Sequence, residues 1–366
     1  MPKLKAEQLR LIGARIFEAA GASVEEAQIV ARLLANANLV GHDSHGVIRI
    51  PQYVHSIESG DIVLGAPVEI VRENPSTAVV DGNWGFGQVI ASRAMEIAIE
   101  KAGDTAVSSV SVQNCNHIGR LGDYAMMATE REMIAIVVAN NHGAGRNVAP
   151  WGGRERRLST NPICVGIPTG PRGAVTSTPI VLDITSSVVA EGKVRVMRNR
   201  GEPVPAGWII DAEGNPSTDP NDLYGPPQGA ILPLGDLVGH KGFGLGLVID
   251  ILSGGLSGAG CSRPDATRIG NAILMTVYNI SSFVSTEAFY RQVSDLVSYV
   301  KSSSLAPDFD EVIVPGEPEA RLAAERGENG IFVEDETWSQ IVASAKKLGV
   351  QLAGIIPSVK DIDEAR

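Results

Sequence analysis

The stretch AVSSVSVQNCNHIGRLGDYAMMATEREMIAIVVAN, residues 106–140, decides the fold class. It begins with a β-branched run at Ala106–Val112 and ends with another at Ile134–Ala139, and each run has the length of one buried strand. Between the two runs we expect a loop rich in histidine and glycine, and then a helix at Gly122–Arg131. Strand, loop, helix and strand in this order indicate a mixed α/β protein.

The neighbouring segments extend this pattern in both directions. Further strands are predicted at Ala78–Val80, Ile163–Ile167, Ile180–Leu182, Ala272–Asn279 and Glu311–Val314. Helices are predicted between them at Gly87–Lys101, Val188–Arg198 and Gly242–Leu256. Residues 201–240 contain seven prolines and seven glycines, which is typical of a long surface excursion or a lobe.

Both ends of the chain have helical spacing instead. A first helix covers residues 5–20, and Ser23 followed by Glu26 forms a capping-box pattern for a second. A third follows Gly46 and runs to Gly60, and a long amphipathic helix at Thr286–Ser303 precedes two closing helices. We therefore predict a discontinuous helical domain from residues 1–75 plus 285–366, and a mixed-sheet domain at 76–284 with a smaller lobe around 118–165.

Composition excludes several classes of protein. A net charge of −11 argues against binding to nucleic acid or to a membrane surface, because both require a cationic face. The three cysteines lie far apart, so neither a disulfide framework nor a structural zinc site is predicted. The amphipathic N-terminal segment is not a signal peptide, and no apolar run is long enough to span a bilayer. We expect a cytoplasmic enzyme.

Residues 41–49, GHDSHGVIR, are the first of four segments that suggest a ligand site. Five of the six histidines lie within two residues of a glycine, which lets the backbone approach a ligand. If a helix begins near Ser44 or His45, its free N–H groups favour an anion, and Arg49 follows one turn later on the same face. An arginine fork beside an imidazole suits a 2-hydroxy acid. Alternatively, Asp43 or Ser44 only caps the helix and Arg49 is a solvated charge.

The second segment, residues 114–122, follows a predicted strand, where α/β proteins place catalytic residues. The imidazole of His117 has the chemistry to move the proton that accompanies hydride transfer. Cys115 lies two residues earlier and would face the same side of a strand, which allows a rival interpretation as a Cys/His nucleophilic pair. No third member or oxyanion element accompanies that pair.

The third segment, LDITSS at residues 182–187, is an apolar strand that ends in Asp183 and continues into hydroxyl residues. Such a segment can orient a histidine and bind a phosphate, or Thr185 and Ser186 can simply cap a helix. In the fourth, GHKGFGLG at 239–246, alternate glycines are typical of close packing, and Lys241 would reach a ribose or phosphate. The sequence contains no G-x-G-x-x-G, no G-x-x-x-x-G-K-[ST] and no G-x-S-x-G.

Six motifs occur in a fixed order over nearly the whole chain: GHDSHGVIRIPQY, NHIGRLGDYA, VAPWGG…STNPICVGIP, VLDITSSVVAEGK, GHKGFGLGLVIDILSG and VPGEPE. This combination resembles the type II malate/L-lactate dehydrogenase family, which includes sulfolactate, ureidoglycolate and diketogulonate enzymes and cyclic imino-acid reductases. The resemblance implies binding of NAD or NADP on a non-Rossmann fold. It thereby accounts for the missing glycine fingerprint.

The resemblance also implies residue roles. The implied catalytic residues are His117 as acid/base, Asp183, Ser44, His45 and Arg49, which holds the substrate carboxylate. The implied cofactor contacts are His45, Arg120, Leu121, Gly122, Leu182, Asp183, Ile184, Thr185, Ser186, Lys241, Asn271 and Glu317. No metal ligand is implied. Residues 140–146, NNHGAGR, depart from the family pattern in length and chemistry, and we expect them near the substrate.

These residues predict hydride transfer between NAD(P)H and a small 2-oxo or 2-hydroxy acid. The resemblance implies that the enzyme is a homodimer. The alternatives are reduction of a cyclic imino acid, hydrolysis by the Cys115–His117 pair, a metal site drawn from the histidine clusters, and cofactor binding without catalysis. Arg195, Arg198 and Arg200 are either ligands of a 2′-phosphate, which would indicate NADP, or charges at a solvated helix end.

Overall fold

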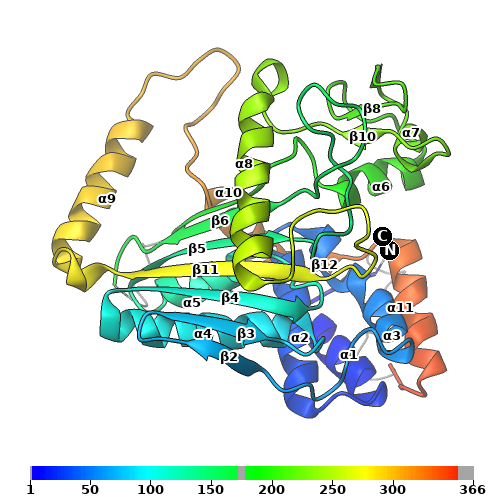
Figure 1. Ribbon diagram of the computed structural model, residues 1–366, viewed down its shortest axis with the longest axis horizontal. Helices are drawn as coiled ribbons and strands as arrows, with labels where there is room; N and C mark the ends of the chain where they lie inside the picture. Colours follow the sequence, from blue (N-terminus) through cyan, green and yellow to red (C-terminus); the bar gives the residue numbers. More distant parts are fainter. Residues whose placement is uncertain (1, 172–177, 353–366) are drawn as a thin grey trace.

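The computed structural model describes residues 2–171 and 178–352, and its centre is a seven-stranded mixed sheet (Figure 1). Only β3 and β4 run parallel, and every other neighbouring pair of strands is antiparallel. The two β-branched runs of residues 106–140 become β4 and β5, which β11 separates. In order across the sheet the strands are β2 (Glu69–Glu73), β3 (Thr77–Asp81), β4 (Val107–Cys115), β11 (Asn271–Asn279), β5 (Met133–Asn140), β6 (Pro162–Ile167) and β7 (Ile180–Thr185).

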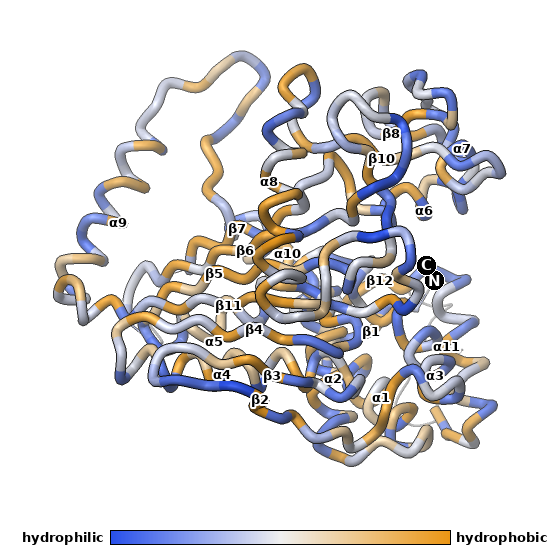
Figure 2. Tube along the Cα trace, in the orientation of Figure 1, coloured by the Kyte–Doolittle hydropathy of each residue, from blue (hydrophilic) through white to orange (hydrophobic). Residues whose placement is uncertain are grey.

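Helices cover both faces of this sheet. On one face lie α4 (Gly87–Thr105) and α5 (Gly122–Thr129), and on the other lies α8 (His240–Asp250), as Figure 1 shows. The tube in Figure 2 shows the apolar strands between these layers. The buried alanines of α4, which are Ala91, Ala94, Ala98 and Ala102, let the helix pack close to the sheet.

A second core joins the two ends of the chain. It contains α1 (Ala6–Ala19), α2 (Val24–Leu39), α3 (Ile50–Glu58) and α11 (Asp335–Lys347), and β1 (Lys3–Leu4) pairs antiparallel with β12 (Ile331–Phe332). The capping box at the start of α2 is confirmed, because the Ser23 hydroxyl accepts from the Glu26 amide and the Glu26 carboxylate accepts from the Ser23 amide. Segments near the two ends of the chain therefore share one core.

A small lobe stands at one end of the sheet (Figure 1). Its three short strands lie in the order β10 (Ala230–Ile231), β8 (Ile209–Ile210) and β9 (Pro216–Ser217), beside α6 (Glu191–Arg200) and α7 (Asn221–Tyr224). Its core also takes in Val148 and Leu158. The expected lobe around 118–165 therefore overlaps only partly with this one, most of which comes from the region rich in proline and glycine.

Three segments differ from the sequence-based expectation. Residues 311–314 form no strand in the described structure, since the Val314 amide donates to the side chain of Glu317 at 3.0 Å instead of joining a sheet. The edge strand β2 was not expected, because its residues lack alternating polarity in the sequence. All five of them are exposed in the structure. Helix α9 (Thr286–Lys301) lies apart from α1–α3 and buries no residue, so the unit 285–366 is not one continuous packing (Figure 1). Among the described helices, none is both long and apolar enough to cross a bilayer.

Candidate active site

Two short 3₁₀ turns, Asp43–His45 and Val47–Arg49, lead into α3. The helix therefore begins at Ile50 and not near Ser44, which corrects the expectation of an anion site at a helix N-terminus there. Two amides of this turn already have partners: that of Arg49 donates to the Gly46 carbonyl, and that of Val47 donates to Asn38 Oδ1 at 2.7 Å.

Arg49 is the cation that this turn presents. Its Nε donates to the Ser44 carbonyl at 2.7 Å and its Nη1 donates to Gln52 Oε1 at 2.7 Å. These two bonds fix the plane of the guanidinium, and Nη2 has no hydrogen bond among the described contacts. The positive charge lies close enough to His45 and His117 to lower the pKa of both rings. Arg49 can thus hold a carboxylate beside two imidazoles.

His117 lies in the loop after β4, where it contacts Tyr53 of α3 and His45 of the turn Asp43–His45. The Tyr53 hydroxyl is 2.7 Å from His117 Nδ1, and the His45 ring stacks on the His117 ring with centroids 5.5 Å apart. Ser44 Oγ lies 3.1 Å from His45 Nδ1. Burial lowers the pKa of His45 to about 3 and that of His117 well below its usual range, with Arg49 adding to both. The structure therefore brings Ser44, His45, Arg49 and His117 together.

Cys115 is not paired with His117, which corrects the Cys/His interpretation. The thiol is fully buried, and its contacts are the carbonyls of Asn116 at 3.3 Å and Gly87 at 3.9 Å. Burial raises its pKa far above the usual range, so the nucleophilic thiolate is suppressed. The expectation that alternate strand residues share a face fails here because β4 ends at Cys115 and the chain turns.

A second group of predicted residues surrounds Asp183, near the end of β7. Its Oδ2 accepts from the Gly122 amide at 2.8 Å and lies 3.6 Å from Arg120 Nε. Burial raises the pKa of Asp183, and the charges of Arg120 and His42 oppose that shift. Arg120 is buried, and its Nε makes no hydrogen bond with the described residues. Because Arg120 also lowers the pKa of His45, this group adjoins the histidine pair.

Some of the remaining predicted cofactor contacts lie near Asp183, and others lie in α8 and α10 (Glu317–Asn329). Leu182 and Ile184 lie in the ladder between β7 and β6, while the Thr185 and Ser186 hydroxyls donate to nearby carbonyls. Lys241 is exposed in the first turn of α8. Glu317 begins α10, where it pairs with Lys301.

Asn271 holds the loop that carries His117 through side-chain hydrogen bonds. Its Oδ1 accepts from the Ile118 amide at 3.0 Å, and its Nδ2 donates to the Asn140 carbonyl at 2.9 Å and to Asn141 Oδ1 at 3.3 Å. These bonds join residues 140–146 to the residue that follows His117. The atypical segment therefore lies beside the loop that carries His117.

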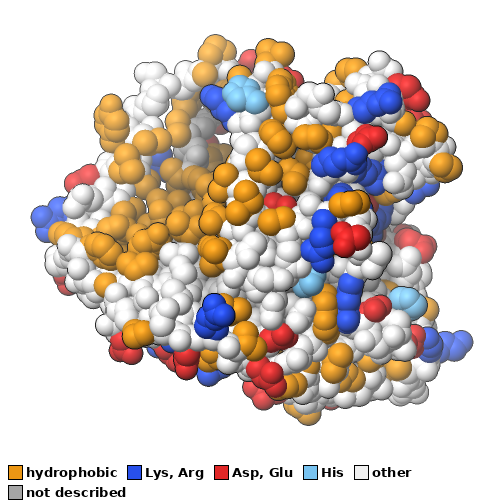
Figure 3. Space-filling model, viewed as in Figure 1, with side chains coloured by type: hydrophobic (Ala, Val, Ile, Leu, Met, Phe, Trp, Pro, Cys, Tyr) orange, Lys and Arg blue, Asp and Glu red, His pale blue; other side chains and the backbone are white. Residues whose placement is uncertain are grey.

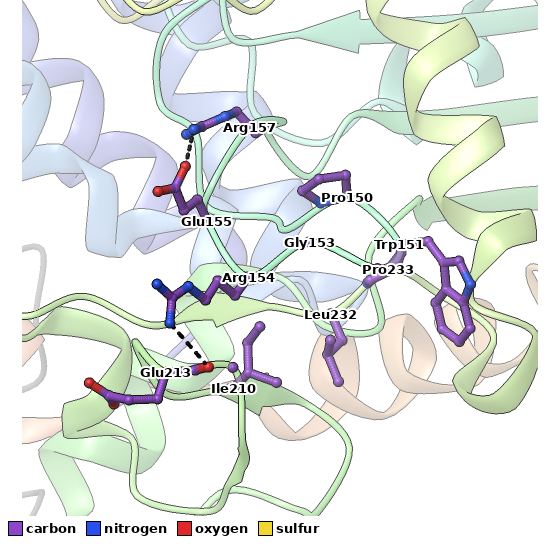
Figure 4. Close-up of a pocket in the computed structure, with 12 residues that line it drawn as sticks. Pro150, Trp151, Gly153, Arg154, Glu155, Arg157, Ile210, Glu213, Leu232 and Pro233 are labelled. Atoms are coloured by element: carbon purple, nitrogen blue, oxygen red, sulfur yellow. Dashed lines mark hydrogen bonds and ion pairs between the residues drawn. The ribbon is translucent and has the colours of Figure 1, made fainter.

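An open cavity of about 930 Å³ lies elsewhere, between residues 150–157 and the small lobe (Figure 4). Arg154 spans it and donates to the Glu213 carbonyl at 3.4 Å, while Trp151 flanks it and contacts the His240 ring. None of the predicted site residues lines this cavity. Among the described residues, no three His, Cys, Asp or Glu side chains are placed to hold a metal ion.

Comparison with known proteins explains this arrangement. A profile described as malate/L-lactate dehydrogenase matches residues 4–342. The chain belongs to this dehydrogenase family. It is 39% identical to a malate dehydrogenase of Pyrococcus horikoshii over 92% of its own length and 93% of the relative's. A solved structure of malate dehydrogenase from Pyrococcus horikoshii superposes with a TM-score of 0.85 at 36% identity, covering 96% of each chain.

A solved structure that carries the name of a different activity is also similar to this chain. A delta1-piperideine-2-carboxylate reductase from Pseudomonas syringae superposes with a TM-score of 0.78 at 26% identity, covering 94% of this chain and 100% of that one. The sequence-based assignment to the malate/L-lactate dehydrogenase family and to its mixed α/β fold is therefore confirmed.

Two residues of this candidate site were not predicted from the sequence. Tyr53 closes the motif GHDSHGVIRIPQY and follows Arg49 by four residues, which places both on one side of the chain's turn into α3. Gln88 in α4 donates to the Tyr53 hydroxyl at 2.8 Å. The spacing of Arg49 and Tyr53 was a usable signal, whereas nothing local marked Gln88, since it reaches the site only through the packing of α4.

Proposed function

We propose that this protein transfers a hydride between a nicotinamide dinucleotide and a small 2-oxo or 2-hydroxy acid. The observation that carries the proposal is the placement of His117 beside Arg49, because one side chain moves a proton and the other fixes a carboxylate within a single partly buried site. Names of relatives support the substrate class, since a malate dehydrogenase is among them.

The residues of the chain perform distinct parts of this reaction. A nicotinamide dinucleotide bound beside His117 and Arg49 would provide the hydride chemistry. Arg49 binds the carboxylate and orients that carbon. His117 Nε2, the ring nitrogen opposite Tyr53, gives a proton to the carbonyl oxygen in reduction and takes one from the hydroxyl in oxidation. The stacked His45 ring closes one side of the site and limits the access of water.

The residues around Asp183 fit the polar parts of a dinucleotide. Arg120 carries a buried nitrogen without a hydrogen bond in the described structure, and Asp183 accepts only one strong backbone bond. A ligand with hydroxyl and amide groups would satisfy both. We therefore assign Arg120, Leu121, Gly122 and residues 182–186 to cofactor binding, with Lys241 and Glu317 as outer contacts.

We propose NAD as the preferred cofactor. Arg195 lies close enough to Arg49, the residue that we assign to the substrate carboxylate, for their charges to interact. The three arginines considered as ligands of a 2′-phosphate already have partners: Arg195 with Glu191, Arg198 with Asn221 and Arg200 with Glu334. KM should be lower for NADH than for NADPH, and a lower KM for NADPH would contradict the assignment.

A cyclic imino acid is the second candidate substrate. The structural neighbour from Pseudomonas syringae carries this activity in its name, and an imine nitrogen can accept from His117 Nε2 as a carbonyl oxygen does. The higher identity to malate dehydrogenase favours the oxo acid. Turnover of piperideine-2-carboxylate and oxaloacetate with the same reduced cofactor separates the two.

We further propose that the protein is a homodimer. Helix α9 buries none of its residues, although Leu296, Tyr299 and Val300 are apolar and exposed. Exposed apolar residues also lie on α8 and on the helical turn that comes after it. Figure 3 shows hydrophobic side chains around the hollow between α8 and α9. A patch of this kind is typical of a subunit interface, and a second copy of the chain would cover α9.

The proposed compartment is the cytoplasm. Cys115, Cys164 and Cys261 are all unpaired, and the first two are fully buried. Unpaired thiols of this kind are typical of a reducing compartment.

The deciding experiment measures consumption of NADH and NADPH with a panel of 2-oxo acids and cyclic imino acids. His117→Ala should lower kcat by about 10²–10⁴, the usual size of an acid/base contribution. His55→Ala is the matched control, because His55 is exposed on the same helix as Tyr53 and has no place in the site. Near-normal turnover by His117→Ala would contradict the assigned role.

A further inference from the structure

Three side chains from three elements form one hydrogen-bonded chain that ends on His117. Gln88 in α4 donates through Nε2 to the hydroxyl of Tyr53 in α3, at 2.8 Å. The same hydroxyl lies 2.7 Å from Nδ1 of His117, in the loop after β4. Gln88 and Tyr53 are 1% and 2% exposed, so water does not compete for these bonds.

The direction of these bonds follows from the chemistry of the donors. The Gln88 amide nitrogen can only donate, so the Tyr53 oxygen accepts from it and keeps its own proton to give. Among the described contacts of that hydroxyl, the acceptor that remains is Nδ1 of His117. Nδ1 is then unprotonated, and the proton of the neutral ring resides on Nε2.

We propose that Tyr53, held by Gln88, is a positioning residue that fixes His117 in its Nε2–H tautomer. The proposal rests on the function proposed above and specifies how that site is prepared. Residues that set the tautomer of a catalytic histidine act through its second nitrogen, as Tyr53 does here.

The surroundings of the ring favour this neutral form. Arg49 and His45 face His117 from the two short turns, and Tyr53 faces it from α3. The ring therefore has a positive charge nearby and, among the described residues, no carboxylate in contact. Burial acts in the same direction. A neutral ring with Nε2–H is a hydrogen-bond donor to a carbonyl oxygen. The ligand-free protein is thus prepared to bind a 2-oxo acid.

Oxidation of a hydroxy acid requires the opposite tautomer. Nε2 must then be bare, and Nδ1–H must donate to the Tyr53 oxygen, which has a second lone pair for it. The Tyr53 proton would then lack an acceptor among the described residues, because Gln88 occupies the oxygen as a donor. Gln88 therefore shifts the balance toward the tautomer that presents Nε2–H as a hydrogen-bond donor to a carbonyl oxygen.

The direct test is ¹⁵N NMR of the imidazole of His117 in the full-length protein at neutral pH. The wild type should show an unprotonated, hydrogen-bonded Nδ1 and a protonated Nε2. Tyr53→Phe should remove the signature of the hydrogen bond at Nδ1. Tyr124→Phe is the matched control, since the Tyr124 hydroxyl is also buried and donates to the neighbouring Ile118 carbonyl without touching His117.

A substitution at Gln88 gives a sharper test. In Gln88→Glu a carboxylate faces Tyr53, so the hydroxyl donates to position 88, its oxygen accepts from Nδ1–H, and the tautomer reverses. Gln88→Met fills similar space without an acceptor and should leave the proton on Nε2. In Tyr53→Phe, kcat for 2-oxo acid reduction should fall at least about tenfold while KM changes by less than about twofold, because Tyr53 acts through His117 and not on the substrate.

Several outcomes would overturn the proposal: a proton on Nδ1 in the wild type, an unchanged spectrum in Tyr53→Phe, or the same tautomer in Gln88→Glu. The spectra need no substrate or cofactor. Absence of turnover with every acid would therefore contradict the proposed function and leave the tautomer assignment standing, whereas the wrong tautomer in an active enzyme would contradict only the positioning role.

Discussion

Replacing Gly87 with alanine tests how the catalytic loop is held. Gly87 is the first residue of α4, and a Cβ atom there would lie 2.3 Å from the carbonyl oxygens of both Asn116 and His117. These atoms belong to the backbone, so they cannot move aside as a flexible side chain would. Either α4 or the loop that carries His117 must shift.

The size of the effect follows from two opposing contributions. Alanine in place of glycine in a helix stabilises by about 0.5–1 kcal/mol. Overpacking against a rigid neighbour destabilises by about 1–3 kcal/mol. Gly103→Ala, in the same helix, has only the first contribution, because nothing lies within 4 Å of its Cβ position. The free energies of unfolding of the two variants should therefore differ by about 1–3 kcal/mol, with Gly87→Ala the less stable.

Urea denaturation gives these free energies, and steady-state kinetics with the best acid gives the second readout. Because the loop shift separates His117 from Tyr53, kcat should fall in Gly87→Ala and remain unchanged in Gly103→Ala. Equal stability and equal turnover in the two variants would refute the claim that the start of α4 packs rigidly against the catalytic loop.

Three further predictions concern binding, pH and assembly. Arg49→Ala should raise KM for the acid at least about tenfold, since a charge-assisted bond contributes roughly 1.5–3 kcal/mol, and an unchanged KM would reject its carboxylate role. Burial lowers the pKa of His45 to about 3. On acidification the unfolded chain therefore binds a proton at this residue at a higher pH than the folded protein does. Stability present above pH about 6.5 should be lost on acidification toward pH 3, by at most about 1.4 kcal/mol per pH unit for this residue, and His45→Gln should weaken that dependence in thermal melts. Leu296→Glu should shift a sedimentation profile from dimer toward monomer, and an unchanged profile would exclude α9 from the interface.

Much of the fold was predictable because periodicity and capping act locally. The capping box at Ser23 and the strands that became β4 and β5 are encoded within a few residues. Which strands become neighbours is not encoded in that way, and β11 separates β4 from β5 although it lies far along the chain. The incorrect strand at 311–314 has the same origin, because an extended, β-branched segment becomes a strand only if an edge is available to pair with it.

The site was predictable in its residue types and less so in its contacts. Histidine and arginine beside glycines indicated His45, Arg49 and His117 as chemistry-bearing residues, and the structure brings them together. The partner of His117 was not predictable from its neighbours in sequence: Cys115 faces the core, while Tyr53 comes from α3, sixty-four residues earlier. Long-range packing decides such pairs.

The most direct test of the account is a crystal structure of the protein with a nicotinamide dinucleotide and a 2-hydroxy or 2-oxo acid. We predict the acid carboxylate on the Arg49 guanidinium and the oxygen of the reacting carbon at about 2.6–3.2 Å from His117 Nε2. Tyr53 should remain on Nδ1. A reacting carbon bound out of reach of His117, or a carboxylate held by another cation, would contradict the account.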